Sequence, residues 1–582
     1  MKRWFKYVKP YLPYFIIGPL CMIVEVIGEV LMPYCMSEII DTAVVDDVAT
    51  GNWQHVLLIA VFMVIMALLM MLGGVGGAYF GAKASVNFAS DLRQDIYNKV
   101  QSFSFENIDK FNTGSLVTRL TNDVTQIQNF VNTLLRMFLR SPGMLIGALI
   151  MAINLNPRLA GVLAVIIPFM VVVVTLIISK AFPKFRNMQV KIDKLNSNVQ
   201  ENLTNVRVIK SFVREDYEKK KFANSNSELK NAGLSAMHNM ILMQPVVMLF
   251  MNLTTICVMW FGGNQVISST MSPGDLSAFI TYITQILMSL MMFTAMFMTS
   301  SRAIASGKRI CEVLDEKVIL SDENAANRDK TVENGDVEFK NVTFRYYKNS
   351  EEKVLDNINL KIKHGSTVGI IGSTGSGKTT LVSMIPRLYD VDEGEVLVDG
   401  VSVKDYSLEN LRDGVGMVLQ KNVLFSGSIA GNLRWGDEDA SDEDIVKAAQ
   451  SAQADLFVSS MKDGYDTELE QGGKNVSGGQ KQRLCIARAL LKKPKILILD
   501  DSTSAVDTAT EARIRQAFKN ELADSTKIII AQRISSVKDA DEIVVINDGK
   551  ITGIGTHDEL MENNEEYKEI YYSQMDKKEG NA

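Results

Sequence analysis

Six long apolar segments in the first half of the chain set the strongest limit on how it folds. They lie at about residues 15–40, 55–81, 133–155, 159–182, 239–263 and 275–300. A helix needs roughly 20 mostly apolar residues to cross a bilayer. Six such segments within one half of a chain cannot all be buried in a soluble core. The sequence therefore predicts an all-helical membrane domain of six spans over residues 1–320, with the lipid bilayer as its surroundings.

Lysine and arginine are concentrated on one side of these spans. The N-terminal segment and the long connections 82–132 and 181–238 are rich in them, whereas the short loops 41–53 and 263–274 contain none. Arg158 is the exception on the second side. Because basic residues favour the cytoplasmic ends of spans, we expect both termini and both long connections in the cytoplasm.

The long connections carry helical patterns of their own. Residues 84–103 and 191–222 have helical spacing with charged faces, which predicts that the spanning helices extend into the cytoplasm. Residues 2–11 combine aromatic and lysine side chains, as expected of an amphipathic helix at the membrane surface.

Two carboxylates, Glu25 and Glu29, lie deep within the first span and share one helix face because they are four residues apart. An ionisable side chain at membrane depth is costly, so it normally faces a cavity or a partner helix. Two interpretations stay open at this point: contact with a cationic or polar substrate, or a hydrogen bond to another spanning helix.

Residues 330–575 have the pattern of a soluble α/β domain, followed by a polar tail at 576–582, and they contain a phosphate-binding loop. An apolar strand runs into G-x-x-x-x-G-K-T at residues 372–379, and a helical pattern follows, which is the context that this motif requires. Glycines let backbone N–H groups surround phosphates, Lys378 reaches the β- and γ-phosphates, and the Thr379 hydroxyl ligates Mg²⁺. We therefore expect ATP and Mg²⁺ to bind at Gly372, Ser373, Thr374, Gly375, Ser376, Gly377, Lys378, Thr379 and Thr380.

Two further segments complete the pattern. The apolar run 495–499 ends in Asp500, and ligands of open α/β sheets bind at the carboxyl ends of strands, so Asp500 is placed to hold the Mg²⁺. Ser477, Gly478, Gly479 and Gln480 precede a helical run and predict a second anion site at a helix N-terminus. One phosphate-binding loop cannot use both sites on its own ATP, so we expect a second chain.

The order of these motifs resembles that of the ABC transporters, and specifically half-transporters with an exporter fold, over nearly the whole chain. The resemblance implies that Tyr346 stacks on adenine and that Gln420 touches Mg²⁺ and senses the membrane domain. It implies that residues 477–480 contact ATP held by the partner chain, and that residues 504–507, ending in Asp507, communicate across the ATP-binding dimer.

The same resemblance extends to the cytoplasmic connections of the membrane domain. Residues 206–215 resemble the second connection of these exporters. Five residues resemble the first connection, namely Phe111, Gly114, Leu116, Arg119 and Asp123. The tips of such connections form coupling helices that dock on the ATP domains.

Two positions depart from the family, and both belong to one site. Asp501 stands where the family usually has a glutamate that polarises the attacking water, and its side chain is one methylene shorter. A misplacement of about 1 Å can lower a rate roughly a hundredfold. Gln532 stands where the family usually has a histidine that contacts the γ-phosphate; glutamine donates a hydrogen bond but carries no proton at neutral pH. Together they predict a site that binds ATP well and hydrolyses it poorly.

This asymmetry implies a heterodimer in a bacterial cell membrane. The partner half-transporter is expected to supply the consensus glutamate and histidine, while residues 477–480 of this chain serve the partner's ATP. The chain then resembles the degenerate-site subunit of heterodimeric multidrug-type exporters, which export hydrophobic small molecules at the expense of ATP. Alternatives within the same architecture are a lipid or glycolipid flippase and a peptide exporter, although no N-terminal Cys/His peptidase domain precedes the spans. A non-pumping regulatory or channel-like subunit is the alternative from another class.

Composition excludes other classes of function. The formal net charge is -6, which gives no bulk basic character for binding nucleic acid. The five cysteines form neither a CxxC pair nor a Cys/His cluster with metal-ligand spacing, so we expect buried thiols.

Overall fold

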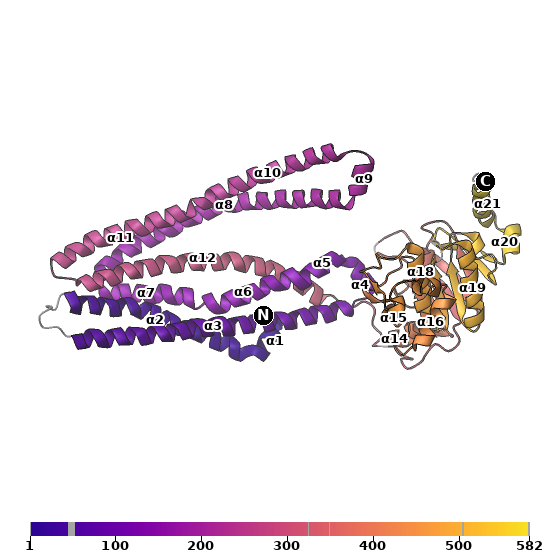
Figure 1. Ribbon diagram of the computed structural model, residues 1–582, viewed down its shortest axis with the longest axis horizontal. Coiled ribbons are helices and arrows are strands. Elements are labelled where there is room, and N and C mark those ends of the chain that lie inside the picture. The colour runs from indigo at the N-terminus through magenta and orange to yellow at the C-terminus, as the bar shows by residue number, and fades with distance from the viewer. Residues whose placement is uncertain (1, 45–52, 324, 348–349, 503–505, 580–582) are drawn as a thin grey trace. The chain divides into compact units, whose positions relative to one another are not determined.

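The computed structural model describes residues 2–44, 53–323, 325–347, 350–502 and 506–579 (Figure 1). The chain forms two compact units, one of Met1–Val100 with Gly114–Asp315 and the other of Gln101–Thr113 with Glu316–Ala582. Several predicted segments lie partly outside the described residues, namely the short loop 41–53, with Asp46 and Asp47, the loop before Asp507, with Ser504 and Ala505, and residues 580–582 of the tail.

Within the described residues, six helical segments are long and apolar enough to cross a membrane, which confirms the predicted six-helix membrane domain. They are Arg3–Ala43, Trp53–Gln101, Thr113–Leu155, Pro157–Thr204, Glu215–Ile267 and Pro273–Met292. The helices that compose this unit are α1 (Lys2–Val8), α2 (Leu12–Val44), α3 (Trp53–Gln101), α5 (Thr113–Thr118), α6 (Val124–Met137), α7 (Arg140–Leu155), α8 (Pro157–Thr204), α9 (Val206–Ser211), α10 (Glu215–Ile241), α11 (Met243–Ile267) and α12 (Pro273–Asp315).

Small residues allow close packing of the first two spans. A Cβ on Gly73 of α3 would lie 2.7 Å from the Cys21 backbone oxygen of α2, and one on Gly77 would meet the Met22 side chain. Because lipid tails are as apolar as leucine, close backbone approach of this kind is a main source of attraction between spanning helices.

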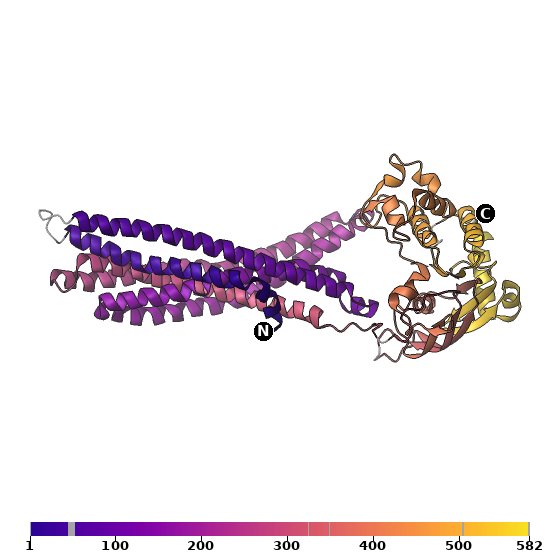
Figure 2. The same cartoon turned by 90° about the horizontal axis from the view of Figure 1, so that it is seen from below.

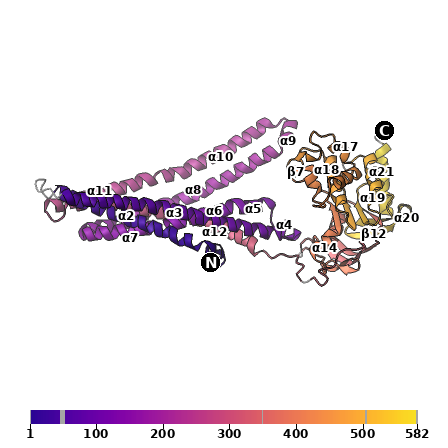
Figure 3. The same ribbon diagram turned by 60° about the horizontal axis from the view of Figure 1, so that its bottom comes forward.

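The helical extensions follow the prediction at the first connection and differ at the second. Helix α3 runs unbroken to Gln101, as the pattern in residues 84–103 indicates. The pattern in residues 191–222 is interrupted: α8 ends at Thr204, the short α9 follows, and α10 begins at Glu215. Val213 adopts a left-handed φ of 52°, and the chain reverses so that α8 and α10 run side by side (Figure 3). The reversal falls within residues 206–215, the segment that the family resemblance indicates as the second connection; the helical pattern alone did not show it, because both arms have exposed polar faces.

The second unit contains two main sheets, whose strands are seen in Figure 2. One is antiparallel, in the order β2 (Leu355–Ile362), β1 (Val337–Phe344), β4 (Glu393–Val398), β5 (Val401–Ser402). The other has the order β12 (Lys550–Gly555), β11 (Glu542–Asn547), β3 (Thr367–Ile371), β10 (Thr526–Ile530), β9 (Ile496–Asp500), β6 (Val415–Val418). Its strands are parallel except for β12 at the edge, and this is the predicted α/β domain.

Helices and short strands complete this unit. They are α4 (Phe105–Lys110), α13 (Lys378–Ser383), α14 (Leu408–Asp413), β7 (Gly427–Ser428), α15 (Ile429–Leu433), α16 (Asp442–Ser451), α17 (Asp455–Val458), β8 (Glu468–Leu469), α18 (Gly478–Leu491), α19 (Thr508–Glu521), α20 (His557–Asn563) and α21 (Glu565–Glu579).

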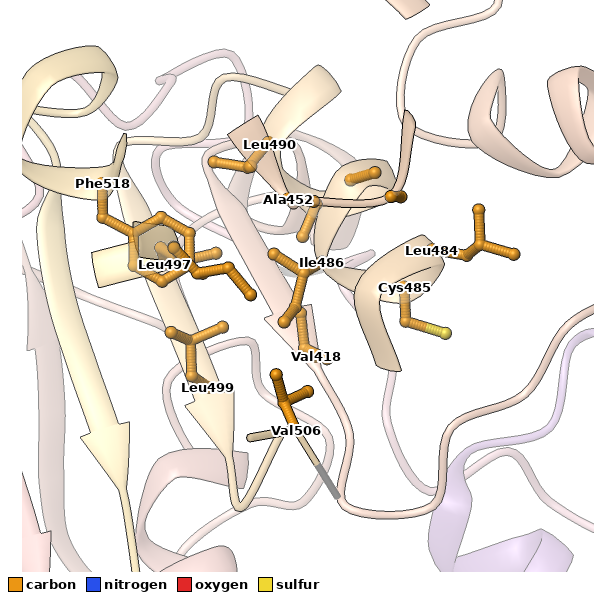
Figure 4. Packing of buried hydrophobic residues seen from close by; sticks show 14 of the residues in the cluster. Val418, Ala452, Leu484, Cys485, Ile486, Leu490, Leu497, Leu499, Val506 and Phe518 are labelled. Carbon is orange, nitrogen blue, oxygen red and sulfur yellow. The ribbon is translucent and has the colours of Figure 1, made fainter. Parts of the chain in front are cut away.

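The parallel sheet is buried on both faces, as its continuous apolar strands require. Leu497 and Leu499 of β9 belong to the same buried cluster as Ile486 of α18 and Phe518 of α19 (Figure 4). This core ties the helix that follows residues 477–480 to the strand that ends in Asp500, and it fixes the positions of both.

Candidate functional site

Three neighbouring parallel strands bring the predicted nucleotide-binding residues to one edge of the sheet. Ile530 at the end of β10 is in register with Ile370 of β3 and with Asp500 of β9. The segments that follow these strands are the phosphate-binding loop, Asp501, and the segment containing Gln532. Because carboxyl ends of parallel strands form the ligand-binding edge of such sheets, the topology assembles one site from residues far apart in sequence.

The loop between β3 and α13 has the backbone that its glycines allow. Gly377 has a φ of 97°, and a Cβ there would lie 2.8 Å from the Val354 backbone oxygen. Side chains other than glycine rarely adopt this conformation, so the motif fixes the turn that presents Lys378 at the start of α13. The cradle expected for phosphates is therefore built into the backbone.

Lys378 lies over this loop. Its Nζ donates to the backbone oxygens of Gly372 at 2.9 Å and Ser373 at 2.6 Å. Burial lowers the pKa of the lysine, and the nearby carboxylates of Asp500 and Asp501 oppose that effect. A phosphate placed in the loop offers stronger, charge-assisted acceptors for the same ammonium group.

Asp500 and Thr379 face each other. The Thr379 hydroxyl lies 2.9 Å from Oδ2 and 3.1 Å from Oδ1 of Asp500, and only 1% of Asp500 is exposed. Burial raises the pKa of Asp500, and the bond from Thr379 partly offsets this. A hydroxyl and a carboxylate in this arrangement are hard oxygen donors of the kind that Mg²⁺ prefers, so the residues fit the ion that the motif implies.

A cavity of about 400 Å³ gathers most of the predicted residues. Tyr346 stands at its wall, where its hydroxyl lies 2.9 Å from that of Thr380 and its ring meets Tyr389 at 5.4 Å between centroids. Gly372 and Ser373 line a neighbouring cavity beside α21 instead. The nucleotide cavity is lined by Tyr346, Val354, Thr374, Gly375, Ser376, Gly377, Lys378, Thr379, Thr380, Gln420, Asp500, Asp501, Ile530 and Gln532.

The two residues that depart from the family contact each other in this cavity. Gln532 Nε2 donates a hydrogen bond to Asp501 Oδ2 at 2.9 Å. Burial raises the pKa of Asp501, while hydrogen bonds from Gln420 and Gln532 and the charge of Arg533 oppose this. The carboxylate at the position of the general base is thus engaged by amide donors, and the sequence alone did not show this pairing.

Residues 477–480 form a capped helix start outside the nucleotide cavity. Ser477 Oγ accepts from the Gln480 N–H at 3.3 Å, and Gln480 Oε1 accepts from the Ser477 N–H at 2.8 Å. Gly478 and Gly479 lie in the first turn of α18, where Gly478 is exposed and Gly479 is half-buried. Asp507 caps α19, where its carboxylate accepts from the Thr510 N–H at 2.9 Å. Both segments remain predicted contacts for a second chain.

The tip of the first long connection, residues 82–132, packs within the second unit. Helix α4 begins at Ser104 with a capping box shared with Asn107, and Phe105 lies 6.1 Å from Tyr389 between ring centroids. The Tyr389 hydroxyl donates to Asp109 Oδ2 at 2.8 Å. Because Tyr389 also contacts Tyr346, one aromatic side chain touches both this tip and the wall of the nucleotide cavity. No motif in the sequence pointed to Tyr389.

In the membrane unit, Glu25 and Glu29 share one arginine. Arg140 of α7 lies 2.6 Å from Glu29 Oε1 and 3.1 Å from Glu25 Oε1, and all three side chains are mostly buried. Gln285 of α12 donates to the Glu29 backbone oxygen at 2.8 Å. The second carboxylate oxygen of each glutamate is buried and has no hydrogen-bond partner among the described residues. Arg140 lies inside the third apolar segment, at 133–155, and the sequence pattern did not identify it as the partner of the two glutamates.

Comparison with known proteins agrees with this architecture. The family model of the ABC transporter transmembrane region matches residues 15–290, and a second family model, described as ABC transporter, matches residues 355–504. The uncharacterized ABC transporter ATP-binding protein YfiB of Bacillus subtilis is 38% identical over 575 residues, covering 99% of both chains. The putative multidrug export ATP-binding/permease protein YgaD of the same organism is 33% identical and covers 98% of both. A solved bacterial Atm1-family ABC exporter with ATP bound has the same fold, with a TM-score of 0.77 over 98% of both chains at 24% identity.

Proposed function

Because this chain belongs to the ABC transporters, as a half-transporter that joins a membrane domain to an ATP-binding domain, we propose that it is the degenerate-site subunit of a heterodimeric exporter. Its own site holds ATP and hydrolyses it slowly. The transported molecules are hydrophobic or amphipathic, which is in line with the putative multidrug export role given for the relative YgaD.

The hydrogen bond between Gln532 and Asp501 carries this proposal. A general base must accept a proton from water, and efficiency requires a carboxylate placed within hydrogen-bond reach of that water. Here the carboxylate accepts from an amide at 2.9 Å and is attached by a shorter side chain than glutamate. The residue opposite it, a glutamine, has no proton to exchange at neutral pH. Binding groups such as Lys378 and Thr379 keep their consensus chemistry, so ATP binds without rapid cleavage.

The intact segment 477–480 supports a catalytic role on the partner's nucleotide. Its capping box orders the first turn of α18, and the small residues Gly478, which is exposed, and Gly479, which is half-buried, would let an anion approach the helix N-terminus. A partner with a glutamate base and a switch histidine would complete one fully active site. ATP bound at both sites would hold the two ATP-binding domains together, and hydrolysis at the partner-supplied site would reset the membrane domains.

Each residue of this chain's site has a defined task toward Mg²⁺ and ATP. Lys378 and the loop backbone bind the phosphates, and Thr379, Asp500 and Gln420 would hold the ion, which neutralises phosphate charge when bound. Tyr346 offers its ring to adenine. Tyr389 contacts both Tyr346 and Asp109, and so couples the α4 tip to the order of this wall of the cavity.

The contacts among the buried side chains of Glu25, Glu29 and Arg140 favour a structural role for these residues over contact with a substrate. One arginine joins α2 to α7 and compensates one of two carboxylates. Removing a partner from such a buried pair leaves an uncompensated charge, which is strongly destabilising. The remaining formal negative charge favours cationic over anionic substrates near this depth of the membrane domain.

Transport and partnership can be tested together. The chain would be expressed with and without a second half-transporter that carries the consensus glutamate and histidine, purified, and reconstituted into proteoliposomes containing a fluorescent cationic dye. We expect ATP-dependent movement of the dye only for the two-chain complex. Full transport by this chain alone would contradict the heterodimer. Movement of a labelled lipid but no dye would favour a flippase, and ATP binding without movement of either would favour a non-pumping subunit.

A further inference from the structure

The C-terminal helix α21 reaches the segment that carries Gln532. Gln574 Nε2 donates to the Gln532 backbone oxygen at 2.8 Å, and Gln574 Oε1 accepts from the Ile534 N–H at 3.0 Å. One side-chain amide thus uses both its donor and its acceptor on backbone groups flanking Arg533, as a neighbouring strand would. The paired bonds fix the path of the backbone at this point.

That backbone determines where the Gln532 side chain lies. Gln532 leaves the end of β10 and lines the nucleotide cavity, where its amide donates to Asp501. A side chain can be held accurately only if its backbone is held, because small displacements of reacting or binding groups carry large penalties. Gln574 therefore bonds the backbone of Gln532, whose side chain lines the nucleotide cavity.

Helix α21 is itself fixed to the domain before it reaches Gln574. Tyr567 is fully buried and its hydroxyl lies 2.8 Å from His557 Nδ1. The Glu566 carboxylate accepts from Asn547 Nδ2 at 3.0 Å and from the Thr552 hydroxyl at 2.5 Å. The described part of the helix is thus docked rather than loosely attached, which makes it a rigid support.

The same helix also borders the phosphate-binding loop. A cavity of about 300 Å³ is enclosed by Gly372 and Ser373 on one side and by Glu566, Glu569 and Ile570 of α21 on the other. Asn547, which bonds Glu566, also accepts a long hydrogen bond of 3.5 Å from the Ser373 hydroxyl. The helix therefore contacts the segment that carries Gln532 directly and is linked to the phosphate-binding loop through Asn547.

We propose that Gln574 is a positioning residue for this nucleotide site: it acts on bound ATP through Gln532, and α21 thereby sets how long ATP is held. The long retention of ATP at this site rests on the proposed function. The positioning of Gln532 by Gln574 does not. Any factor that undocks the end of α21 would shorten the lifetime of ATP at this site.

The test compares the full-length wild type, Gln574→Ala, Gln532→Ala and the double variant, each with the partner chain in nanodiscs. Release of a fluorescent ATP analogue is followed after a chase with excess ATP, and the phase altered by Gln532→Ala identifies this chain's site. We expect Gln574→Ala to accelerate that phase roughly three- to tenfold, the scale of one or two lost hydrogen bonds. The double variant should release no faster than Gln532→Ala, because residues acting through one another are not additive.

Gln516→Ala is the matched control, because this glutamine of α19 bonds only Asn520 on its own helix among the interactions described, and it should leave release unchanged. Gln574→Glu keeps the acceptor for Ile534 but loses the donor, and should give an intermediate rate. An unchanged release rate in Gln574→Ala, or acceleration in the double variant equal to the product of both single effects, would overturn the proposal. Rapid hydrolysis at this site would contradict the proposed function. The comparison of the double variant with Gln532→Ala would still test whether Gln574 acts through Gln532.

Discussion

Gln532 donates a hydrogen bond to Asp501 across the nucleotide cavity, with 2.9 Å between Nε2 and Oδ2. The two residues come from the ends of adjacent parallel strands, β10 and β9, so the contact follows from sheet register. Their partnership joins the two departures from the family into one structural unit. We therefore expect that changing either residue alone would leave the site incomplete.

Restoring both consensus residues should activate the site. In a complex whose partner lacks its catalytic glutamate, Asp501→Glu with Gln532→His is expected to raise steady-state ATP hydrolysis about ten- to a hundredfold, because the base is extended and the switch residue gains a titratable nitrogen. The measurement is phosphate release by the reconstituted complex. Each single change should give less than a third of the gain, and an inactive double variant would show that the deficiency lies elsewhere.

Asp500 gives a pH dependence whose sign is fixed by burial. Burial raises its pKa in the folded chain, so its contribution to stability is complete at acid pH and is lost as pH rises through the raised pKa. Without nucleotide, Asp500→Asn should therefore melt at a higher temperature than the wild type at pH 7. The difference should shrink as pH falls toward about 4, the ordinary pKa of aspartate.

Thermal melts with and without MgATP check this prediction. MgATP should stabilise the wild type at pH 7 more than Asp500→Asn, since the substitution removes the negative charge that the carboxylate offers to Mg²⁺. A lower melting temperature of the nucleotide-free variant at pH 7 would contradict the burial argument.

Tyr389 joins the α4 tip to the nucleotide cavity. Tyr389→Phe removes the hydrogen bond to Asp109 but keeps the ring contacts with Phe105 and Tyr346. We expect basal ATP hydrolysis to change less than twofold, while stimulation by a transported dye falls roughly three- to tenfold because the tip is held less firmly. Asp109→Asn should have a similar, smaller effect. Equal losses of basal and stimulated activity would argue for a general folding defect.

The membrane trio predicts a compensating set of substitutions. Arg140→Met leaves two buried carboxylates without their shared cation and should destabilise the protein by about 3–5 kcal/mol. Adding Glu25→Gln and Glu29→Gln should recover most of this loss, as measured by thermal unfolding in detergent. Arg158→Met, at an exposed position at the start of α8, is the control. Failure of the triple variant to recover would contradict the pairing.

Much of the architecture was predictable because its signals are strong and local. Six apolar segments fix the membrane domain, and the strand-loop-helix around Lys378 fixes the phosphate-binding loop. Asp500 was predictable because an apolar strand ends in a carboxylate at the ligand-binding edge of a parallel sheet.

Contacts between distant residues were not predictable from these signals. Arg140 lies within an apolar segment, and nothing in the sequence indicates that it faces both Glu25 and Glu29. Gln574 is a polar residue in a charged terminal helix, where its composition favours a solvated position. The reversal around Val213 lies within residues 206–215, which the family resemblance placed at the second connection; the helical pattern alone did not show it, because the helices on both sides share one polar pattern.

ATP hydrolysis by the reconstituted two-chain complex most directly decides whether the two nucleotide sites are unequal. Two variants are compared at saturating MgATP: Asp501→Ala in this chain, and replacement of the catalytic glutamate in the partner. We expect Asp501→Ala to retain at least half of the wild-type rate, and the partner variant to lose about 99% of it, the hundredfold scale of a displaced base. If Asp501→Ala abolishes turnover as fully as the partner variant does, both sites hydrolyse ATP and the asymmetric heterodimer is wrong.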